Sequence, residues 1–199
     1  MGRMTYWMNV SLDLLIQRSA GDHVAGEEGG EWARVDEQLH REFNQRGRGM
    51  ASFVEGRIIY EMMETFWPSA AEDESLPNYL REWGKIWTAA PKILVSNSRT
   101  TAGYNTRIVG GADAITRLAA IRDATDGTIA VGGATLATQL LQNGLLDELL
   151  LYTHPAILGS GRPLFDEVTE PLECDLLEHA TFDSGVALNR YQIRGQRTE

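Results

Sequence analysis

The sequence predicts an α/β fold whose sheet is mostly parallel and ends in an antiparallel hairpin. Short apolar runs of strand length alternate with longer segments of helical periodicity along most of the chain. This alternation is typical of parallel strands joined by helices. The last strand-like runs, 172–182 and 186–193, flank Asp183-Ser184-Gly185, whose residue types favour a hairpin turn. The C-terminal strands are therefore expected to be antiparallel.

The first elements follow from apolar spacing and glycine. Residues 4–10 predict a buried strand at the sheet centre, followed by a glycine-rich loop over 19–31. From Trp32 onward apolar residues recur at helical spacing, which predicts a helix that ends at Gly47 and Gly49.

The next elements are bounded by prolines. A short strand at 51–54 precedes a helix over 58–66, and Pro68 is expected to end that helix. An acidic, poorly structured connection then leads to a helix around 80–87 and a strand at 92–95.

The remaining elements complete the alternation. A strand at 105–109 and a helix over 112–124 come first, and a strand at 129–131 leads into a helix that ends at Gly144. A central strand is expected at 148–154, followed by a turn-rich excursion before the hairpin.

The composition is that of an ordinary globular protein, with 43% hydrophobic and 23% charged residues. A length of 199 residues fits one domain over 1–199. The net charge of −10 argues against nucleic acid or an anionic membrane as the main partner. Cys174 is the only cysteine, so no internal disulfide and no cysteine-based metal site is expected, and Cys174 itself should be buried or half-buried. The sequence lacks a signal-peptide pattern, which favours a cytoplasmic location.

The stretch at 129–137 combines a short buried strand, the pair Gly132-Gly133 and the first turn of a helix. A strand that enters a helix directly through glycines leaves the backbone N–H groups of the helix N-terminus uncovered. A phosphate can lie directly on such groups. The same pair could also be a plain tight turn between a strand and a helix.

Other turns that follow predicted strands also suit an anionic ligand. Gly56-Arg57 precedes a helix, and Ser96-Asn97-Ser98-Arg99 follows a strand. Together with Gly132-Gly133 they lie at the carboxyl ends of strands, where α/β sheets bind ligands. Guanidinium groups, hydroxyls and bare N–H groups match a ligand with several phosphates. The sequence has neither GxGxxG nor GxxxxGK[ST], so neither a Rossmann site nor a P-loop is predicted.

Several segments are similar to one known family. They are Val131-Gly-Gly-Ala-Thr-Leu, Gly144-Leu-Leu-Asp-Glu148, Leu158-Gly-Ser-Gly-Arg-Pro-Leu-Phe165 and Gly56-Arg57-Ile-Ile-Tyr-Glu61. The chain resembles, over nearly its whole length, the dihydrofolate reductase superfamily, in the branch of the C-terminal reductase domain of riboflavin biosynthesis proteins and its stand-alone relatives. This resemblance implies a three-layer α/β/α sandwich around a mixed sheet, with NADPH as the cofactor.

The resemblance also implies roles for individual residues. Ser96 and Arg99 would lie near the adenosine 2′-phosphate. Leu14 departs from the family pattern because glycine is usual there, and Ile59 stands where dihydrofolate reductases have a phosphate-binding threonine. Gly132 and Gly133 would pack against the pyrophosphate, and Arg57 would contact a phosphate. The other residues expected to bind the cofactor are Gly56, Val131, Ala134 and Thr135.

The catalytic candidates are acids. Asp13 matches the acid in the family's Ser-Leu-Asp-Gly pattern, so the resemblance places it beside the nicotinamide; the alternative is that Asp13 caps a local turn. Asp36 and Glu37 follow Trp32 on the same predicted helix, where dihydrofolate reductases carry the acid that binds the substrate ring. Both could equally lie on the solvated face of that helix. No metal site is expected.

The leading interpretation is an NADPH-dependent reductase that transfers a hydride to a small heterocycle, such as a ribosylaminopyrimidine or a pterin. The alternative is a non-catalytic protein of the same fold that binds a nucleotide or a flavin-like ligand. Apolar residues crowd 149–152 and 176–177, and the related proteins are typically two-fold dimers. A homodimer that uses the C-terminal strands is therefore expected.

Overall fold

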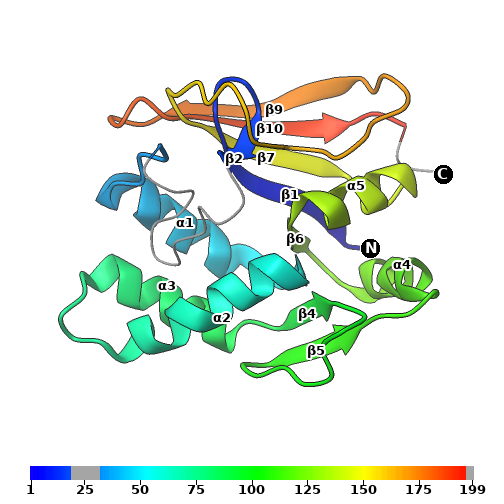
Figure 1. Cartoon of the computed structure of the whole chain (residues 1–199), viewed down its shortest axis with the longest axis horizontal. Helices are drawn as coiled ribbons and strands as arrows, with labels where there is room; N and C mark the ends of the chain where they lie inside the picture. The colour runs from blue at the N-terminus through cyan, green and yellow to red at the C-terminus, as the bar shows by residue number, and fades with distance from the viewer. Residues whose placement is uncertain (19–31, 196–199) are drawn as a thin grey trace.

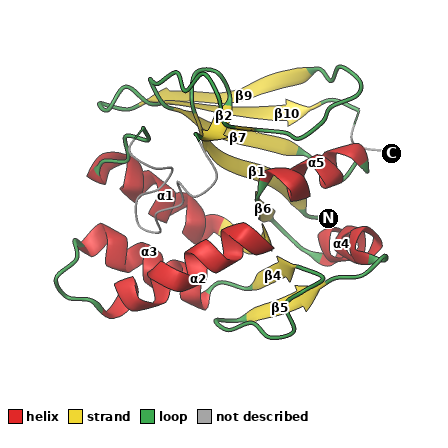
Figure 2. Ribbon diagram, in the orientation of Figure 1, coloured by secondary structure: helices red, strands yellow, loops and turns green. Residues whose placement is uncertain are grey.

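The computed structural model of the protein describes residues 1–18 and 32–195. An eight-stranded sheet forms the middle layer, as expected from the alternating sequence pattern. Helices α1, α2 and α3 lie on one side of the sheet, and α4 and α5 lie on the other (Figures 1 and 2). The predicted three-layer α/β/α sandwich is confirmed. The glycine-rich loop predicted at 19–31 lies outside the described residues.

The strands alternate with the helices along the chain. The strands are β1 Arg3–Val10, β2 Leu15–Gln17, β3 Met50–Gly56, β4 Lys92–Val95, β5 Thr106–Val109, β6 Thr128–Gly132, β7 Glu148–Thr153, β8 Arg162–Pro163, β9 Cys174–Thr181 and β10 Ala187–Ile193. The helices are α1 Glu37–Gly49, α2 Arg57–Glu72, α3 Asn78–Ala89, α4 Ala114–Ala124 and α5 Ala134–Gln142.

The main sheet has the order β5-β4-β3-β6-β1-β7-β10-β9. The pairs from β5 to β7 are parallel, and β10 is antiparallel to both β7 and β9. The prediction of a parallel sheet with a C-terminal antiparallel hairpin is confirmed. The short strands β2 and β8, which the sequence did not predict, form a separate two-stranded sheet.

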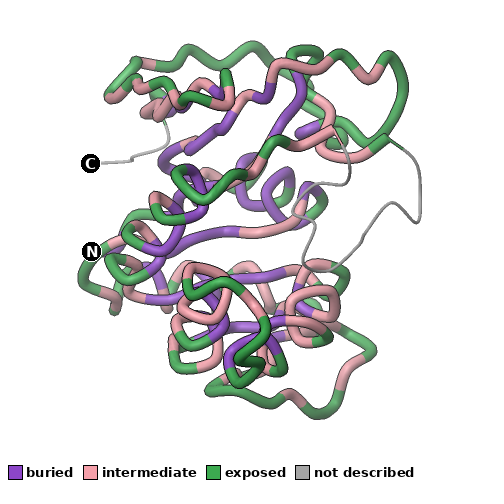
Figure 3. Tube along the Cα trace, turned by 90° about the vertical axis from the view of Figure 1, so that its left-hand side faces the viewer, coloured by how far each residue is buried: buried purple, intermediate pink, exposed green. Residues whose placement is uncertain are grey.

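Apolar side chains fill the space on both sides of the sheet. The central strands carry much of the buried chain (Figure 3). The cluster under α4 and α5 is aliphatic and includes Val54, Val131, Leu136 and Leu140. The cluster under α1, α2 and α3 is aromatic and includes Phe43, Phe53, Trp83, Trp87 and Tyr152.

Two predicted helix boundaries were wrong. Helix α1 begins at Glu37 rather than at Trp32, because the extended Asp36 accepts a hydrogen bond from the backbone N–H of Leu39 at 2.9 Å and so starts the helix there. Helix α2 continues through Pro68 to Glu72. The loss of one backbone hydrogen bond at Pro68 is offset because its neighbours Trp67, Ala70 and Ala71 are buried in the core.

The closeness of α2 and α3 depends on Gly84. A Cβ atom at Gly84 would lie 2.5 Å from the carbonyl oxygen of Trp67, so only glycine fits at this crossing. The sequence pattern marked Gly84 as part of a helix, and the structure shows that its lack of a side chain lets the helices touch.

A buried ion pair ties the amino edge of the sheet together. The Asp147 side chain accepts hydrogen bonds from Arg122 Nη2 at 2.6 Å and from the Met4 backbone N–H at 2.8 Å. Its backbone N–H donates to Met4 and its carbonyl oxygen accepts from Ile193. Since both charged residues are buried, Asp147 holds the end of α4, the start of β1 and the end of β10 in register.

Breaking this pair should destabilise the fold strongly. Asp147→Asn leaves the Arg122 guanidinium buried without its counter-charge, and the free energy of unfolding should fall by about 3–5 kcal/mol. The matched control is Glu37→Gln, which breaks the exposed pair with Arg41 and should cost roughly 0.3–0.5 kcal/mol. Urea unfolding of both variants checks this, and equal losses would contradict it.

Candidate cofactor site

The junction of β6 and α5 has the geometry that the sequence predicted. Gly133 has a φ of 105°, which favours glycine, and it is the N-cap of α5 without any side-chain capping bond. The Gly133 carbonyl oxygen accepts the first helical hydrogen bond, from Ala137. The backbone N–H groups in the first turn of α5 are therefore free to meet an anion, and the helix dipole adds to the attraction.

A groove runs along the carboxyl edge of the sheet beside this helix terminus. Its wider part, of about 820 Å³, lies between Gly133 and Thr135 on one side and Gly56 and Arg57 on the other. A second cavity of about 560 Å³ is lined by Ser96, Ser98 and neighbouring residues. Both cavities are lined by Arg57, Val95 and Gln139, so they form one elongated site.

Most of the predicted cofactor residues meet in this groove. Its walls include Gly56, Arg57, Ser96, Gly133, Ala134 and Thr135. Val131 is fully buried in the core below and lines neither cavity. Gly132 also lies beneath the groove, where an added Cβ atom would be 3.2 Å from Ile59 Cγ2. The Ile59 side chain thus packs on the glycine turn and lines the groove where the related reductases have a hydroxyl.

The two predicted arginines differ in position. Arg57 lies at the junction of the two cavities and pairs with Glu61 at 2.8 Å. Arg99 lines neither cavity. Its guanidinium donates to Glu64 at 3.0 Å, to Glu61 at 3.4 Å and to the carbonyl oxygen of Thr101. Glu64 and Glu61 raise the pKa of Arg99. Arg99 therefore faces α2 rather than the groove.

Sequence reasoning missed Arg162. Its Nη2 donates to Thr135 Oγ1 at 2.8 Å, which places a second guanidinium at the first turn of α5. Strand β8 brings it there by pairing with β2, and a Cβ atom at Gly161 would lie 1.9 Å from the Gln17 carbonyl oxygen. Arg162 lies within the segment 158–165 that carries part of the family resemblance, but the sequence predicted only a turn there and did not show what the turn would approach.

The structure places Asp13 outside the groove's lining but at a defined contact. Its carboxylate accepts hydrogen bonds from Ser11 Oγ at 2.6 Å and from the backbone N–H groups of Leu158 and Gly159 at 3.1 and 2.8 Å. These bonds lower the pKa of Asp13 to about 2. Asp13 is thus an anion at neutral pH that clamps the segment after β7 onto the end of β1.

Leu14, the departure beside Asp13, keeps the backbone conformation that glycine favours, with a φ of 55°. Its carbonyl oxygen accepts a hydrogen bond from Leu164, next to β8. Leucine at this position therefore adopts the left-handed backbone conformation that a glycine would adopt without strain.

The helix acids are engaged elsewhere. Asp36 Oδ1 caps α1 by accepting from Leu39, and Glu37 forms an exposed ion pair with Arg41 at 2.6 Å. The structure does not bring Asp13, Asp36 and Glu37 together around one point of the groove, since each has its own partner in a different segment.

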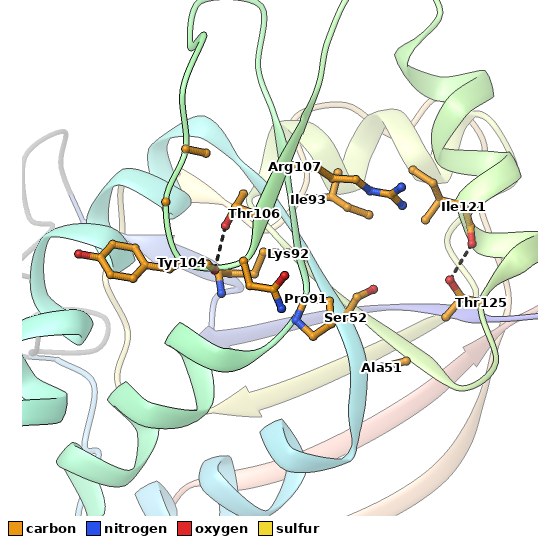
Figure 4. A pocket seen from close by; sticks show the side chains of 13 residues that line it. Ala51, Ser52, Pro91, Lys92, Ile93, Tyr104, Thr106, Arg107, Ile121 and Thr125 are labelled. Carbon is orange, nitrogen blue, oxygen red and sulfur yellow. Dashed lines mark hydrogen bonds between the residues drawn. The ribbon is translucent and has the colours of Figure 1, made fainter.

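A third cavity, of about 530 Å³, lies at the opposite edge of the sheet (Figure 4). The starts of β3, β4 and β5 contribute to its walls. Lys92 and Arg107 are the charged residues in its lining. Lys92 donates to the carbonyl oxygens of Trp87 and Ala90, at the end of α3, and burial lowers its pKa to about 8. Lys92 therefore stabilises a helix terminus.

Within 1–18 and 32–195, no helix is both long and apolar enough to cross a membrane. The same part of the chain holds no group of His, Cys, Asp and Glu side chains with the arrangement of a metal site.

Comparison with known structures defines the class of the protein. The fold is similar to a candidate riboflavin biosynthesis protein from Shewanella sp. PV-4, with a TM-score of 0.64 and 22% identity over 96% of this chain and 99% of that chain. It is also similar to dihydrofolate reductase from Enterococcus faecalis complexed with NADP(H), with a TM-score of 0.60 and 14% identity over 96% of each chain. These similarities show that the chain has the dihydrofolate reductase fold.

The family follows from the sequence comparison. Residues 5–188 match the RibD C-terminal domain, and the chain belongs to this family. RibD of Acinetobacter baumannii has a similar fold, with a TM-score of 0.62 and 16% identity over 97% of this chain and 58% of that chain. The uncharacterized protein YyaP of Bacillus subtilis strain 168 is 41% identical over 64 residues, which span only 34% of that protein.

The contacts of Asp13 predict a local effect of its mutation. Asp13→Asn keeps one acceptor oxygen but turns an amide N–H₂ group toward a backbone donor, so the Leu158 and Gly159 amides should exchange hydrogen faster. In the native protein the clamp should be complete above about pH 4 and weaken as the pH falls toward 2, because folding lowers this pKa. Exchange measured by NMR checks both statements; unchanged protection in Asp13→Asn would refute the clamp.

Proposed function

We propose that the protein is an NADPH-dependent reductase that transfers a hydride to a small heterocyclic substrate. The observation that carries the proposal is the uncapped N-terminus of α5, which opens into the groove between Arg57 and Arg162. Backbone N–H groups and flanking guanidinium groups are the combination that binds a pyrophosphate. The NADP(H) complex of the Enterococcus reductase, a structural relative, supports the choice of cofactor.

The length of the groove supports a dinucleotide rather than a single phosphate. The cavity beside Ser96 and Ser98 would take the adenosine end of the cofactor. Their hydroxyl groups and Arg57 are suitable donors for a 2′-phosphate. The cavity beside Gly133 would hold the pyrophosphate and lead toward β1.

The end of β1 offers a place for the nicotinamide ring. The pairing of β1 with β6 stops at Tyr6–Val131, whereas its pairing with β7 continues to Val10–Thr153. Beyond Tyr6, no strand among the described residues pairs with the edge of β1 that faces β6. The backbone N–H and C=O groups along this edge can form hydrogen bonds with the carboxamide group of the nicotinamide, as they would with a neighbouring strand.

When bound, NADPH would supply the hydride. The protein would position the cofactor and the substrate and would exclude water from the reacting atoms. Strands β2 and β8 lie over the α5 terminus and would exclude water from the reacting atoms. The roles proposed for Asp13, Asp36 and Glu37 as acids rest on the family resemblance. Asp13, an anion at neutral pH, suits orientation of a substrate group better than donation of a proton.

The alternative of a non-catalytic ligand-binding protein rested on the departure at Leu14. Because Leu14 retains the left-handed conformation, that departure gives no reason to expect a disabled site. NADPH oxidation in the presence of pterins, pyrimidines and quinones would separate the two functions.

Gly133 provides the direct test of the phosphate site. Gly133→Asp should abolish NADPH binding, because a carboxylate would face the pyrophosphate at the helix terminus. Any side chain at this φ is strained, so Gly133→Ala is the matched control that carries the strain without the charge. Calorimetric titration should show binding by the alanine variant and none by the aspartate variant. Normal titration of Gly133→Asp would refute the site.

The two arginines give a test of cofactor preference. Arg57→Ala should weaken NADPH binding by roughly tenfold or more, as expected for a lost charged hydrogen bond, and affect NADH less. Arg99→Ala should leave the preference unchanged, because Arg99 is bound by Glu64 away from the groove. If Arg99→Ala alone lost the preference, the assignment of the 2′-phosphate to the Ser96 turn and Arg57 would be wrong.

We also propose a homodimer formed through β9. This strand lies at the edge of the sheet and leaves Leu176 and Leu177 57% and 46% exposed. Cys174, predicted to be buried or half-buried, is exposed at its start. An exposed edge strand with apolar side chains is a typical association surface.

Light scattering at micromolar concentration should give twice the monomer mass for the native protein. Leu176→Lys with Leu177→Lys should give the monomer mass, because the charges would have to be desolvated in the interface. Leu172→Lys, at an exposed position before β9, is the control for added charge alone. A native protein of monomer mass would contradict the proposal.

A further inference from the structure

Asn9 carries a polar side chain near the end of β1, the strand whose edge is proposed to hold the nicotinamide ring. Asn9 is the penultimate residue of β1, and its backbone pairs with Tyr152 on β7. Neighbouring Trp7 packs in the aromatic cluster on the α1 side of the sheet, so the Asn9 side chain, two residues on, points to the same side. It lies about 7 Å beyond the level of Gly132 along the sheet, at the rise of a strand.

His154 determines which way the Asn9 amide faces. The His154 ring is fully buried, and its Nδ1 accepts a hydrogen bond from the Arg34 backbone N–H at 2.9 Å. Nδ1 therefore has no proton, and the neutral ring must carry its hydrogen on Nε2. Nε2 lies 2.9 Å from Asn9 Oδ1. Because Nε2 donates, the Asn9 oxygen must face His154.

Burial and the neighbouring residues keep the His154 ring neutral and protonated at Nε2. Burial lowers its pKa to about 4, with a further contribution from Arg34, so the ring stays neutral at physiological pH. Trp32 packs edge-on against it at 5.6 Å between ring centroids. The ring cannot exchange roles between its nitrogens without breaking the bond from Arg34 or the bond to Asn9.

The hydrogen bond from His154 therefore fixes the direction in which the Asn9 Nδ2 group can donate. With Oδ1 held by His154, the Asn9 Nδ2 group points away from the ring, and among the described residues it has no hydrogen-bond partner. We propose that Asn9 binds the substrate by donating from Nδ2 to a ring carbonyl oxygen, with His154 as the residue that positions it. This rests on the proposed reductase function and narrows its substrate class to heterocycles that present a carbonyl acceptor at the hydride-accepting end.

Two acidic side chains that could accept hydrogen bonds from substrate amino groups already accept them from the backbone. Asp36 caps α1 and Asp13 accepts from Leu158 and Gly159. A substrate that offers only amino groups at this point would leave the Asn9 donor unsatisfied and face it with another donor. A site built to donate discriminates strongly against such a ligand.

Replacing the Asn9 amide donor by a carboxylate acceptor should shift the binding preference from a ligand with ring carbonyl groups toward a ligand with amino groups. The probes are 6-aminouracil, which has ring carbonyl oxygens, and 2,4,6-triaminopyrimidine, which carries amino groups in their place. Calorimetry at pH 8 on the NADPH-loaded protein should show tighter binding of 6-aminouracil to the native protein. Asn9→Asp should shift the ratio of the two affinities toward the triamine by roughly tenfold, and Asn9→Leu should weaken 6-aminouracil by roughly two- to tenfold.

The test of Asn9 can be distinguished from a failure of the proposed NADPH site. NADPH affinity is measured first for each variant, and loss of NADPH binding by the native protein would refute the proposed function itself. A native protein without preference for 6-aminouracil, or an unchanged ratio in a folded Asn9→Asp variant that binds NADPH, would overturn the role of Asn9.

A second measurement tests the role of His154 without any ligand. Nitrogen-15 NMR of the histidine rings should show His154 protonated at Nε2 and unprotonated at Nδ1 between pH 5 and pH 8, a range chosen to lie above its lowered pKa. The opposite tautomer would turn the Asn9 oxygen toward the substrate and would overturn the proposal.

Discussion

Gly133 is the residue on which the site depends, because it ends a strand and begins a helix with no side chain in between. Its φ of 105° turns the chain out of β6, and α5 starts at the next residue. Since β6 stops here while β1 continues to Val10, this edge of β1 has no further strand partner within residues 1–18 and 32–195. One backbone conformation thus creates both the anion site at the helix terminus and the free strand edge where a flat ring can lie.

Other parts of the chain converge on this junction from a distance. The Asp147–Arg122 pair holds the opposite edge of the sheet, so that the strands reach the groove in fixed register. The Asp13 clamp and the pairing of β2 with β8 bring Arg162 to Thr135. The groove is therefore assembled from contacts that are remote in sequence, which is typical of sites at the carboxyl edge of an α/β sheet.

The sequence predicted those features that follow from local chemistry. Strand β4 was placed correctly because an apolar run follows Pro91, and the Gly132-Gly133 turn because glycines directly follow an apolar strand. The features it missed depend on tertiary contacts. Pro68 lies inside α2 because core packing outweighs a local helix breaker, β2 and β8 are too short to show a pattern, and nothing local shows that Arg99 turns toward Glu64.

The most direct measurement of the central claim is an NMR titration of the labelled protein with NADPH. The backbone amide signals of Gly133, Ala134 and Thr135 should shift most, together with those of Gly56 and Arg57, because their N–H groups line the proposed pyrophosphate site. Signals around Lys92 and Arg107, in the cavity at the opposite edge, serve as the internal control and should stay unchanged. Shifts confined to that opposite cavity, or no shift at the start of α5, would contradict the account.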